Sequence, residues 1–143
     1  MTVDANVFVS ALIPSDSNFK DSIAFVDRVK SRGSSIYCPS LILPECAGAV
    51  VRPTGDLPLA QKAVASIQAW PGINLVSLTK DRAVAGAEIA LRLRLRGADA
   101  VYVALAQEFG TLLITWDREM LTRGAQAVPT VTPAEWLAAH PIV

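Results

Sequence analysis

The sequence predicts an α/β fold, specifically a three-layer α/β/α sandwich around a parallel sheet. Short apolar runs alternate along the 143-residue chain with longer segments in which apolar residues recur at helical spacing. Apolar residues make up 52% of the chain, which indicates a folded protein rather than a disordered one. A chain of this length has room for one hydrophobic core, so we expect residues 1–143 to form a single domain.

Four short runs, each mostly apolar, are expected to be strands. They cover residues 1–3, 36–38, 73–78 and 111–115. The intervals between these runs are long enough to hold helices, and parallel strands need crossover connections of that kind. We therefore expect the strands to pair in parallel.

Helices are expected between these runs and after the last of them. They cover 21–32, about 40–52, a segment from Asp56 to about Trp70, about 79–96, about 99–109 and a short C-terminal segment. Asp56 is suited to cap the third of these helices, and Thr79 or Asp81 the fourth. The run Thr132-Pro133-Ala134-Glu135 is a capping box with proline at the first helical position, so it predicts the start of the last helix.

Glycine and proline mark the expected helix ends. Gly33, Gly97 and Gly110 each follow a helical segment directly, and glycine is the common residue just past a helix C-terminus. Pro53 is expected to end the second helix in a loop over 53–58, because proline removes a backbone donor and disrupts a helix interior.

The residue content excludes several kinds of catalytic site. Thirteen basic and thirteen acidic residues cancel, so the chain lacks the broad positive field of a typical duplex-DNA binder. Cys38 and Cys46 are too few and too far apart for a zinc finger or a disulfide scaffold. With His140 as the only histidine, a histidine zinc site or a Ser-His-Asp triad elsewhere would lack its base. Hydrolytic chemistry would therefore depend on carboxylates, hydroxyls and metal ions.

The sequence shows no membrane or export signal. Residues 1–12 include Asp4 and lack the basic region of a signal peptide, and the apolar run 36–43 is too short to cross a bilayer. We therefore expect a cytoplasmic protein that does not bind a membrane.

Two aspartates follow expected strands directly. Asp4 comes after the strand over 1–3, and Asp117 comes just after the strand over 111–115. In a parallel sheet the carboxyl ends of the strands share one edge, and ligands bind in the crevice outside that edge. The two carboxylates are therefore expected to converge. Taken alone, either aspartate is better explained as a turn residue.

Two further acids begin apolar helices. Glu45 is the only acid in a helix that otherwise looks buried, and a lone buried carboxylate is costly unless it is paired or bound to metal. The helix dipole at a first turn also explains it. Asp99 begins a helix that is apolar on nearly every face and should be deeply buried; by itself Asp99 could serve as an N-cap.

Together the four acids indicate a metal site. Hard divalent cations such as Mg²⁺ or Mn²⁺ prefer oxygen ligands, usually a few carboxylates completed by waters and substrate phosphates. Carboxylates held close together repel one another, and a bound cation relieves that repulsion. Such a site activates water and stabilises phosphoryl transfer without any histidine.

Four motifs in this order resemble the PIN-domain family. They are Val3-Asp4-Ala5-Asn6-Val7, Glu45 following a short strand, Gly97-Ala98-Asp99-Ala100 leading into Ala104-Leu105-Ala106, and Thr115-Trp116-Asp117 after a strand. The resemblance covers nearly the whole chain and is strongest to the VapC-type toxins of toxin–antitoxin pairs. The order and spacing of the four acids carry it, since each motif alone is weak.

The resemblance implies a metal-dependent ribonuclease. Asp4, Glu45, Asp99 and Asp117 would form the acidic quartet that binds Mg²⁺ or Mn²⁺ and hydrolyses RNA phosphodiester bonds. Asn6 and Thr115 match polar positions that support the site. Arg118, which adjoins Asp117, is a weaker candidate for binding the substrate, and Glu119 has a minor role at most.

The expected partners are an RNA substrate, a second copy of the chain and a cognate antitoxin. The high apolar fraction and apolar residues such as Leu57 and Leu59 predict a homodimer. A pocket of four acids can also receive an arginine, whose planar fork pairs with two carboxylates.

Other functions remain open on the sequence alone. One alternative is a protein-binding module that keeps the fold without catalysis. Others are a free-standing nuclease outside any toxin–antitoxin pair and a nuclease directed at DNA. A phosphatase of the haloacid-dehalogenase type fits poorly, because its second acid would fall at Asn6.

Overall fold

A single parallel sheet organises residues 1–142, the part of the chain that the computed structural model describes. Its five strands lie in the order β3-β2-β1-β4-β5. They are β1 Thr2–Val3, β2 Ile36–Pro39, β3 Ile73–Val76, β4 Leu113–Ile114 and β5 Thr130–Val131. Every neighbouring pair is parallel, which confirms the predicted sheet.

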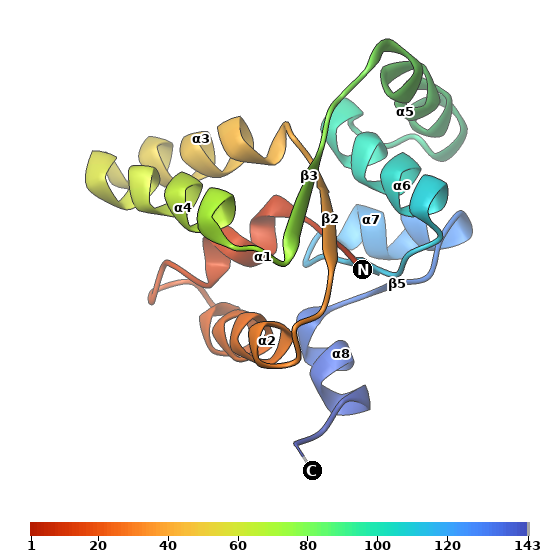
Figure 1. Cartoon of the computed structure of the whole chain (residues 1–143). Coiled ribbons are helices and arrows are strands. Elements are labelled where there is room, and N and C mark those ends of the chain that lie inside the picture. The colour runs from red at the N-terminus through yellow and green to blue at the C-terminus, as the bar shows by residue number, and fades with distance from the viewer. Residues whose placement is uncertain (143) are drawn as a thin grey trace.

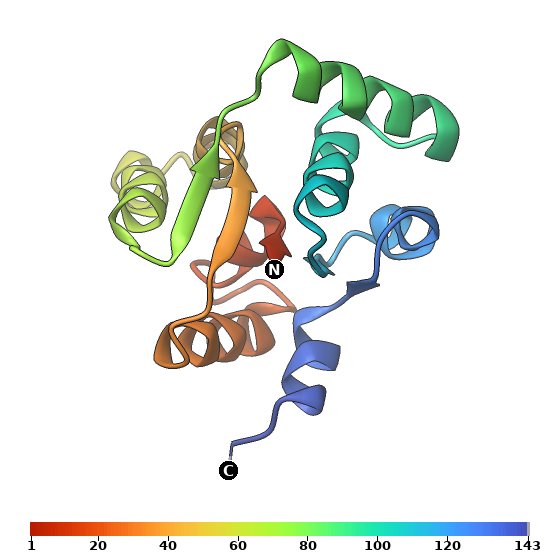
Figure 2. The ribbon, with the colours of Figure 1, turned by 45° about the vertical axis from the view of Figure 1, so that its right-hand side comes forward.

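Helices cover both faces of this sheet. They are α1 Ala5–Ser10, α2 Phe19–Ser31, α3 Ile42–Thr54, α4 Leu57–Ala69, α5 Lys80–Leu93, α6 Gly97–Phe109, α7 Arg118–Thr122 and α8 Pro133–Ala139, with a 3₁₀ turn, η1, at Gly124–Gln126. Helices α1 to α4 lie on one side and α5 to α7 on the other (Figure 1), and α6 packs directly on β1, β2 and β4. The turned view separates α3 and α4 from α5 and α6 across the strands (Figure 2), confirming the α/β/α arrangement.

The chain changes direction across the sheet between β1 and β4. It runs outward from β1 to β2 and β3, and then returns through α5 and α6 to β4 on the other side of β1. In an open parallel sheet this reversal leaves a crevice at the carboxyl ends of the two central strands. Val3 pairs with Ile114, so Asp4 and Thr115 leave the sheet at the same level.

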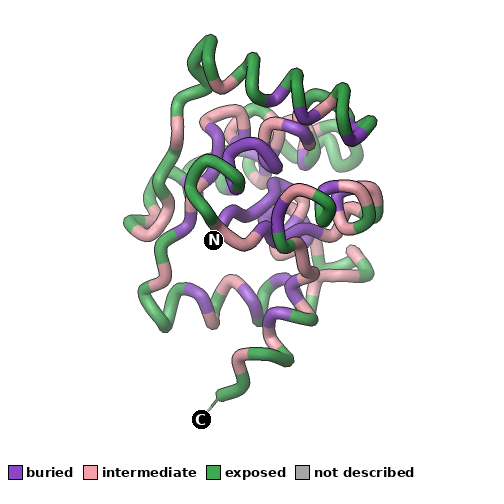
Figure 3. The backbone as a smooth tube through the Cα atoms, turned by 90° about the vertical axis from the view of Figure 1, so that its right-hand side faces the viewer, coloured by how far each residue is buried: buried purple, intermediate pink, exposed green. Residues whose placement is uncertain are grey.

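The core lies along the sheet and the helix faces turned toward it. Buried segments concentrate at the centre of the tube drawing and exposed ones at its rim (Figure 3). Helix α6 buries six residues, Ala100, Tyr102, Val103, Ala104, Leu105 and Ala106. Its predicted deep burial is confirmed, and it makes α6 a rigid support for Asp99 in its first turn.

Most of the predicted caps are present. The side chains of Asp56 and Thr79 accept hydrogen bonds from the backbone of α4 and α5, and the capping box of α8 forms in full. Gly33 and Gly110 end α2 and α6 with φ of +60° and +61°, a conformation that glycine adopts without strain. The sequence thus marks these boundaries through ordinary capping chemistry.

Two predicted helix ends are wrong. Helix α3 continues past Pro53 to Thr54 and ends at Gly55, because Gly55 adopts the left-handed conformation, with φ of +63°, that terminates a helix. Helix α5 ends at Leu93, where Arg94 adopts the left-handed conformation and its carbonyl accepts a hydrogen bond from Arg123. Gly97 therefore begins α6 instead of ending α5.

Four short elements were not predicted. They are α1, α7, η1 and β5. Helix α1 has six residues and β5 has two, which is too short for a clear periodic pattern. Strand β5 is held by its pairing with β4, a tertiary contact that local sequence does not encode.

The packing of α5 on α6 depends on a glycine. A Cβ atom added at Gly86 would lie 3.1 Å from Cγ2 of Val101, whereas one added at Gly48 of α3 meets nothing within 4 Å. We predict that Gly86→Leu lowers the free energy of unfolding by about 1–3 kcal/mol through overpacking. Gly48→Leu serves as the matched control and should be neutral or slightly stabilising, since leucine favours helix. Urea denaturation of both variants measures this, and equal effects would contradict the close approach.

Candidate active site

Asp4 is buried at the carboxyl end of β1, with 5% of its surface exposed. It precedes α1 as the N-cap residue, yet its side chain does not cap that helix. Its Oδ2 accepts a hydrogen bond of 2.7 Å from the hydroxyl of Thr115 instead. The side chain of Asp4 therefore contacts Thr115 and does not cap the helix that follows it.

Thr115 connects the two central strands through its hydroxyl group. Besides donating to Asp4, its Oγ1 accepts the backbone N–H of Asp117 at 2.9 Å and the side-chain amide of Asn6 at 3.3 Å. The Asn6 Oδ1 in turn accepts the backbone N–H of Trp116 at 3.3 Å. Asn6 and Thr115 thus hold the segments after β1 and β4 together, and their role in supporting a site stays a prediction.

Asp117 and Trp116 complete the segment after β4. The Oδ1 of Asp117 accepts the backbone N–H of Met120 at 2.9 Å, so Asp117 caps α7 while it stands beside Thr115. The indole N–H of Trp116 donates to the hydroxyl of Ser22 in α2 at 2.8 Å. This places Asp117 at the same sheet edge as Asp4.

Glu45 approaches from α3 and is tied to α6. It lies in the first turn of α3, and its Oε1 accepts a hydrogen bond of 2.8 Å from the hydroxyl of Tyr102. Tyr102 was not singled out in the sequence, where a tyrosine among alanines and valines is typical of a packed core. The only available signal was its place three residues after Asp99, which puts both on one face of α6.

Asp99 stands in the first turn of α6, and the N-cap of that helix is Arg96. The interpretation of Asp99 as an N-cap is therefore wrong. Burial raises the pKa of Asp99, the charge of Asp117 raises it further, and the charge of Arg96 lowers it. The charge of Asp117 thus acts on Asp99, and Arg96 is the basic residue whose charge opposes it.

The four acids influence one another electrostatically. Burial raises the pKa of Asp4 to about 7, with smaller contributions from the charges of Asp99, Glu45 and Asp117, while the Thr115 hydrogen bond acts in the opposite direction. Burial also raises the pKa of Glu45, and the charge of Asp99 adds to that effect. The structure therefore brings the four predicted acids into one region, where like charges accumulate.

The chemistry of this donor set fits a hard divalent cation. All four groups offer carboxylate oxygens, and their mutual repulsion would be relieved by a positive ion. Within residues 1–142, no group of three or more His, Cys, Asp or Glu side chains is already arranged to hold a metal ion. The assignment of the four acids as metal ligands stays a prediction.

Two charged neighbours stand beside the acids. Arg118 is exposed at the start of α7, next to Asp117, and its role in binding substrate stays a prediction. Glu119 lies 3.7 Å from Arg123 and its charge raises the pKa of Asp99.

None of the helices in residues 1–142 has the length and hydrophobicity that a membrane-spanning helix requires.

Solved structures of other proteins share this fold, and one of them is a toxin–antitoxin complex. A chain of VapBC2 from Rickettsia felis, bound to a DNA fragment from their promoter, aligns with a TM-score of 0.67 and 11% identity over 92% of this chain and 96% of that one. FitAcB from Neisseria gonorrhoeae aligns with a TM-score of 0.68 and 15% identity, over 93% of this chain and 97% of that one. A chain of a toxin–antitoxin complex from Klebsiella pneumoniae aligns with a TM-score of 0.64 and 16% identity, over 92% of this chain and 96% of that one. At these identities the likeness shows the shared fold.

Sequence comparison identifies the family directly. No curated protein sequence matches the chain. The family model of the PIN domain, however, matches residues 1–125, which include all four acids, Asn6 and Thr115. The match covers most of the sequence and agrees with the parallel sheet. This chain belongs to the PIN-domain family.

Proposed function

We propose that this chain is a metal-dependent endoribonuclease and the toxin of a VapBC-type toxin–antitoxin pair. The observation that carries the proposal is the gathering of four acids at the carboxyl ends of β1 and β4, where burial, with smaller contributions from the charges of the other three acids, raises the pKa of Asp4 to about 7. An acidic cluster of this kind is unfavourable for the fold alone. A site that binds cations and phosphates accounts for it.

Asp4, Glu45, Asp99 and Asp117 would hold Mg²⁺ or Mn²⁺. When bound, the metal supplies a water of lowered pKa and positive charge for the transition state of phosphodiester cleavage. Thr115 orients Asp4 by donating to its Oδ2, and Asn6 fixes Thr115 and the Trp116 backbone. A carboxylate of the pocket accepts the proton of the attacking water. Arg118, which is exposed beside Asp117, and Arg96, whose charge acts on Asp99, are the proposed contacts to the RNA backbone.

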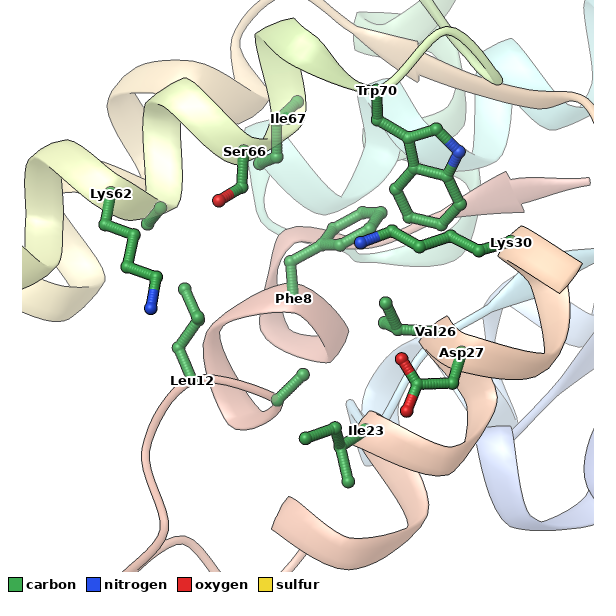
Figure 4. Close-up of a pocket in the computed structure, with 12 residues that line it drawn as sticks. Phe8, Leu12, Ile23, Val26, Asp27, Lys30, Lys62, Ser66, Ile67 and Trp70 are labelled. Carbon is green, nitrogen blue, oxygen red and sulfur yellow. The ribbon is translucent and has the colours of Figure 1, made fainter.

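A cognate antitoxin is the proposed protein partner, because one solved structure with this fold is a toxin–antitoxin complex. A hollow of about 240 Å³ opens between α1, α2 and α4 (Figure 4). Its apolar lining includes Phe8, Ile23, Ile67 and Trp70, and Lys30 lies 4.8 Å from the centre of the Trp70 ring. An amphipathic antitoxin helix with acidic flanks would fit these apolar and basic groups.

A separate apolar surface supports the proposed homodimer. Leu57 of α4 is 63% exposed. It lies with Val51 and Val64 along a shallow groove between α3 and α4. A second copy covering this groove would remove its apolar surface from water.

The nuclease proposal predicts a specific loss of activity. Asp99→Asn and Asp4→Asn should each abolish Mg²⁺- or Mn²⁺-dependent cleavage of single-stranded RNA, because each removes a metal ligand, while the fold is retained. Asp81→Asn is a matched control, since Asp81 also lies in the first turn of a helix, α5, but away from the pocket. Cleavage assays with and without chelator, together with circular dichroism, measure this.

Full cleavage in chelator, or in either variant, would refute the metal mechanism. A wild-type chain that binds its partner but never cleaves RNA would point to the alternative, a protein-binding module. Cleavage of DNA alone would redirect the proposal to a DNA nuclease.

The raised pKa of Asp4 predicts a pH-dependent stability of the metal-free protein. The folded state holds the Asp4 proton up to about pH 7, whereas the unfolded chain loses it near 3.8. Ionising Asp4 therefore destabilises the folded state. The contribution of Asp4 to the free energy of unfolding falls as the pH rises from about 4 to about 7. Thermal melts in chelator should show a smaller decline for Asp4→Asn. Identical profiles would contradict the burial of an ionisable carboxyl.

The partner proposal predicts that Ile23→Asp weakens the antitoxin complex. This change places a negative charge among the apolar side chains of the hollow. The expected loss of binding does not depend on a metal ion at the four acids. Val84→Asp on α5 is the control, because Val84 is another exposed aliphatic residue outside the hollow. Co-purification with the product of the adjacent gene, followed by mass measurement, tests both variants. Equal loss or equal retention would exclude the hollow as the docking site.

A further inference from the structure

The contact between Tyr102 and Glu45 joins the two sides of the sandwich. Tyr102 is fully buried in α6, and its hydroxyl donates to Oε1 of Glu45 in α3 at 2.8 Å. Helix α6 packs on one face of the sheet, and α3 lies on the other side of the strands (Figure 2). The bond links residues 57 positions apart, at the edge of the sheet where the acids gather.

A hydroxyl buried this deeply needs a partner, and the choice of partner is informative. A backbone carbonyl would satisfy a core tyrosine just as well. Here the acceptor is a half-buried carboxylate whose charge acts on Asp4. Among the described residues, the other oxygen of Glu45 accepts no hydrogen bond. The tyrosine therefore holds one oxygen of the carboxylate and leaves the second available.

Fixing Glu45 has an energetic consequence for ligand binding. A free glutamate side chain loses rotamer freedom when it binds a cation, and this loss of conformational entropy weakens binding. The Tyr102 hydroxyl restricts that freedom beforehand. Its ring is enclosed in the core of α6, and Asp99 lies one turn earlier on the same helix face. One rigid helix thus provides Asp99 and orients Glu45.

We propose that Tyr102 is a positioning residue of the metal site. It acts through Glu45, holding that carboxylate toward the other acids so that the site is organised before a cation arrives. This inference rests on the proposed function, in which Glu45 is a metal ligand. Partners that orient metal ligands in this way typically change metal affinity by about 10–100-fold when removed.

The test is a double-mutant cycle on Mn²⁺ binding, measured by titration calorimetry of the chelator-treated protein. The proteins are the wild type, Tyr102→Phe, Glu45→Gln and the double variant. Tyr37→Phe is the matched control, because the Tyr37 ring stacks on Phe109 at 4.6 Å and its hydroxyl makes no hydrogen bond among the described residues. Thermal melting without metal monitors the fold, since the phenylalanine keeps the buried ring.

We expect Tyr102→Phe to weaken Mn²⁺ binding by about tenfold or more, and Tyr37→Phe to leave it unchanged. In the Glu45→Gln background, the loss of the Tyr102 hydroxyl should have little further effect. A structural role alone would lower the melting temperature without this dependence on Glu45.

Three results would overturn the inference. Wild-type affinity in Tyr102→Phe shows that the hydroxyl does not organise the site. An equal loss in both backgrounds shows that Tyr102 does not act through Glu45. No Mn²⁺ binding by the wild type removes the metal site itself, and it alone also overturns the proposed function.

Discussion

The parallel pairing of β1 with β4 is the constraint on which the site depends. These strands contain only two residues each, yet the register of Val3 with Ile114 sets Asp4 beside Thr115. A shift by one residue would turn each side chain to the opposite face. The hydroxyl of Thr115 then binds Asp4, Asn6 and the Asp117 backbone, so a single side chain transmits the register of the strands to the acids.

The rest of the fold brings the remaining acids to this point. Helix α6 crosses the central strands and carries Asp99 at its start, while α3 begins after β2 and carries Glu45. Both helices are anchored by buried faces, so the two carboxylates have little freedom to move apart. The acids consequently remain close although neighbouring negative charges add to the effect of burial in raising the pKa of Asp4, Glu45 and Asp99. Packing energy in the core opposes this repulsion, and stability is thereby balanced against function.

The sequence predicted the parts of this arrangement that follow from local chemistry. Strand ends located Asp4 and Asp117, and capping patterns located the starts of α4, α5 and α8. The end of α5 was missed, because Arg94 adopts a left-handed conformation supported by Arg123 from a distant segment. The link from Tyr102 to Glu45 was missed for the same reason, since it exists only after α3 and α6 have met across the sheet.

The fluorescence of Trp116 can report on the surroundings of the four acids. Its backbone N–H is bound by Asn6, its indole N–H is bound by Ser22, and it lies between Thr115 and Asp117. The other two tryptophans occupy different surroundings, Trp70 at the α1–α2–α4 hollow and Trp136 against Phe25. Indole emission responds to nearby charge and to the rigidity of its hydrogen bonds. Trp116 and Trp70 thus lie at different places in the molecule, so replacing one of them by phenylalanine assigns a fluorescence change to the acids or to the hollow.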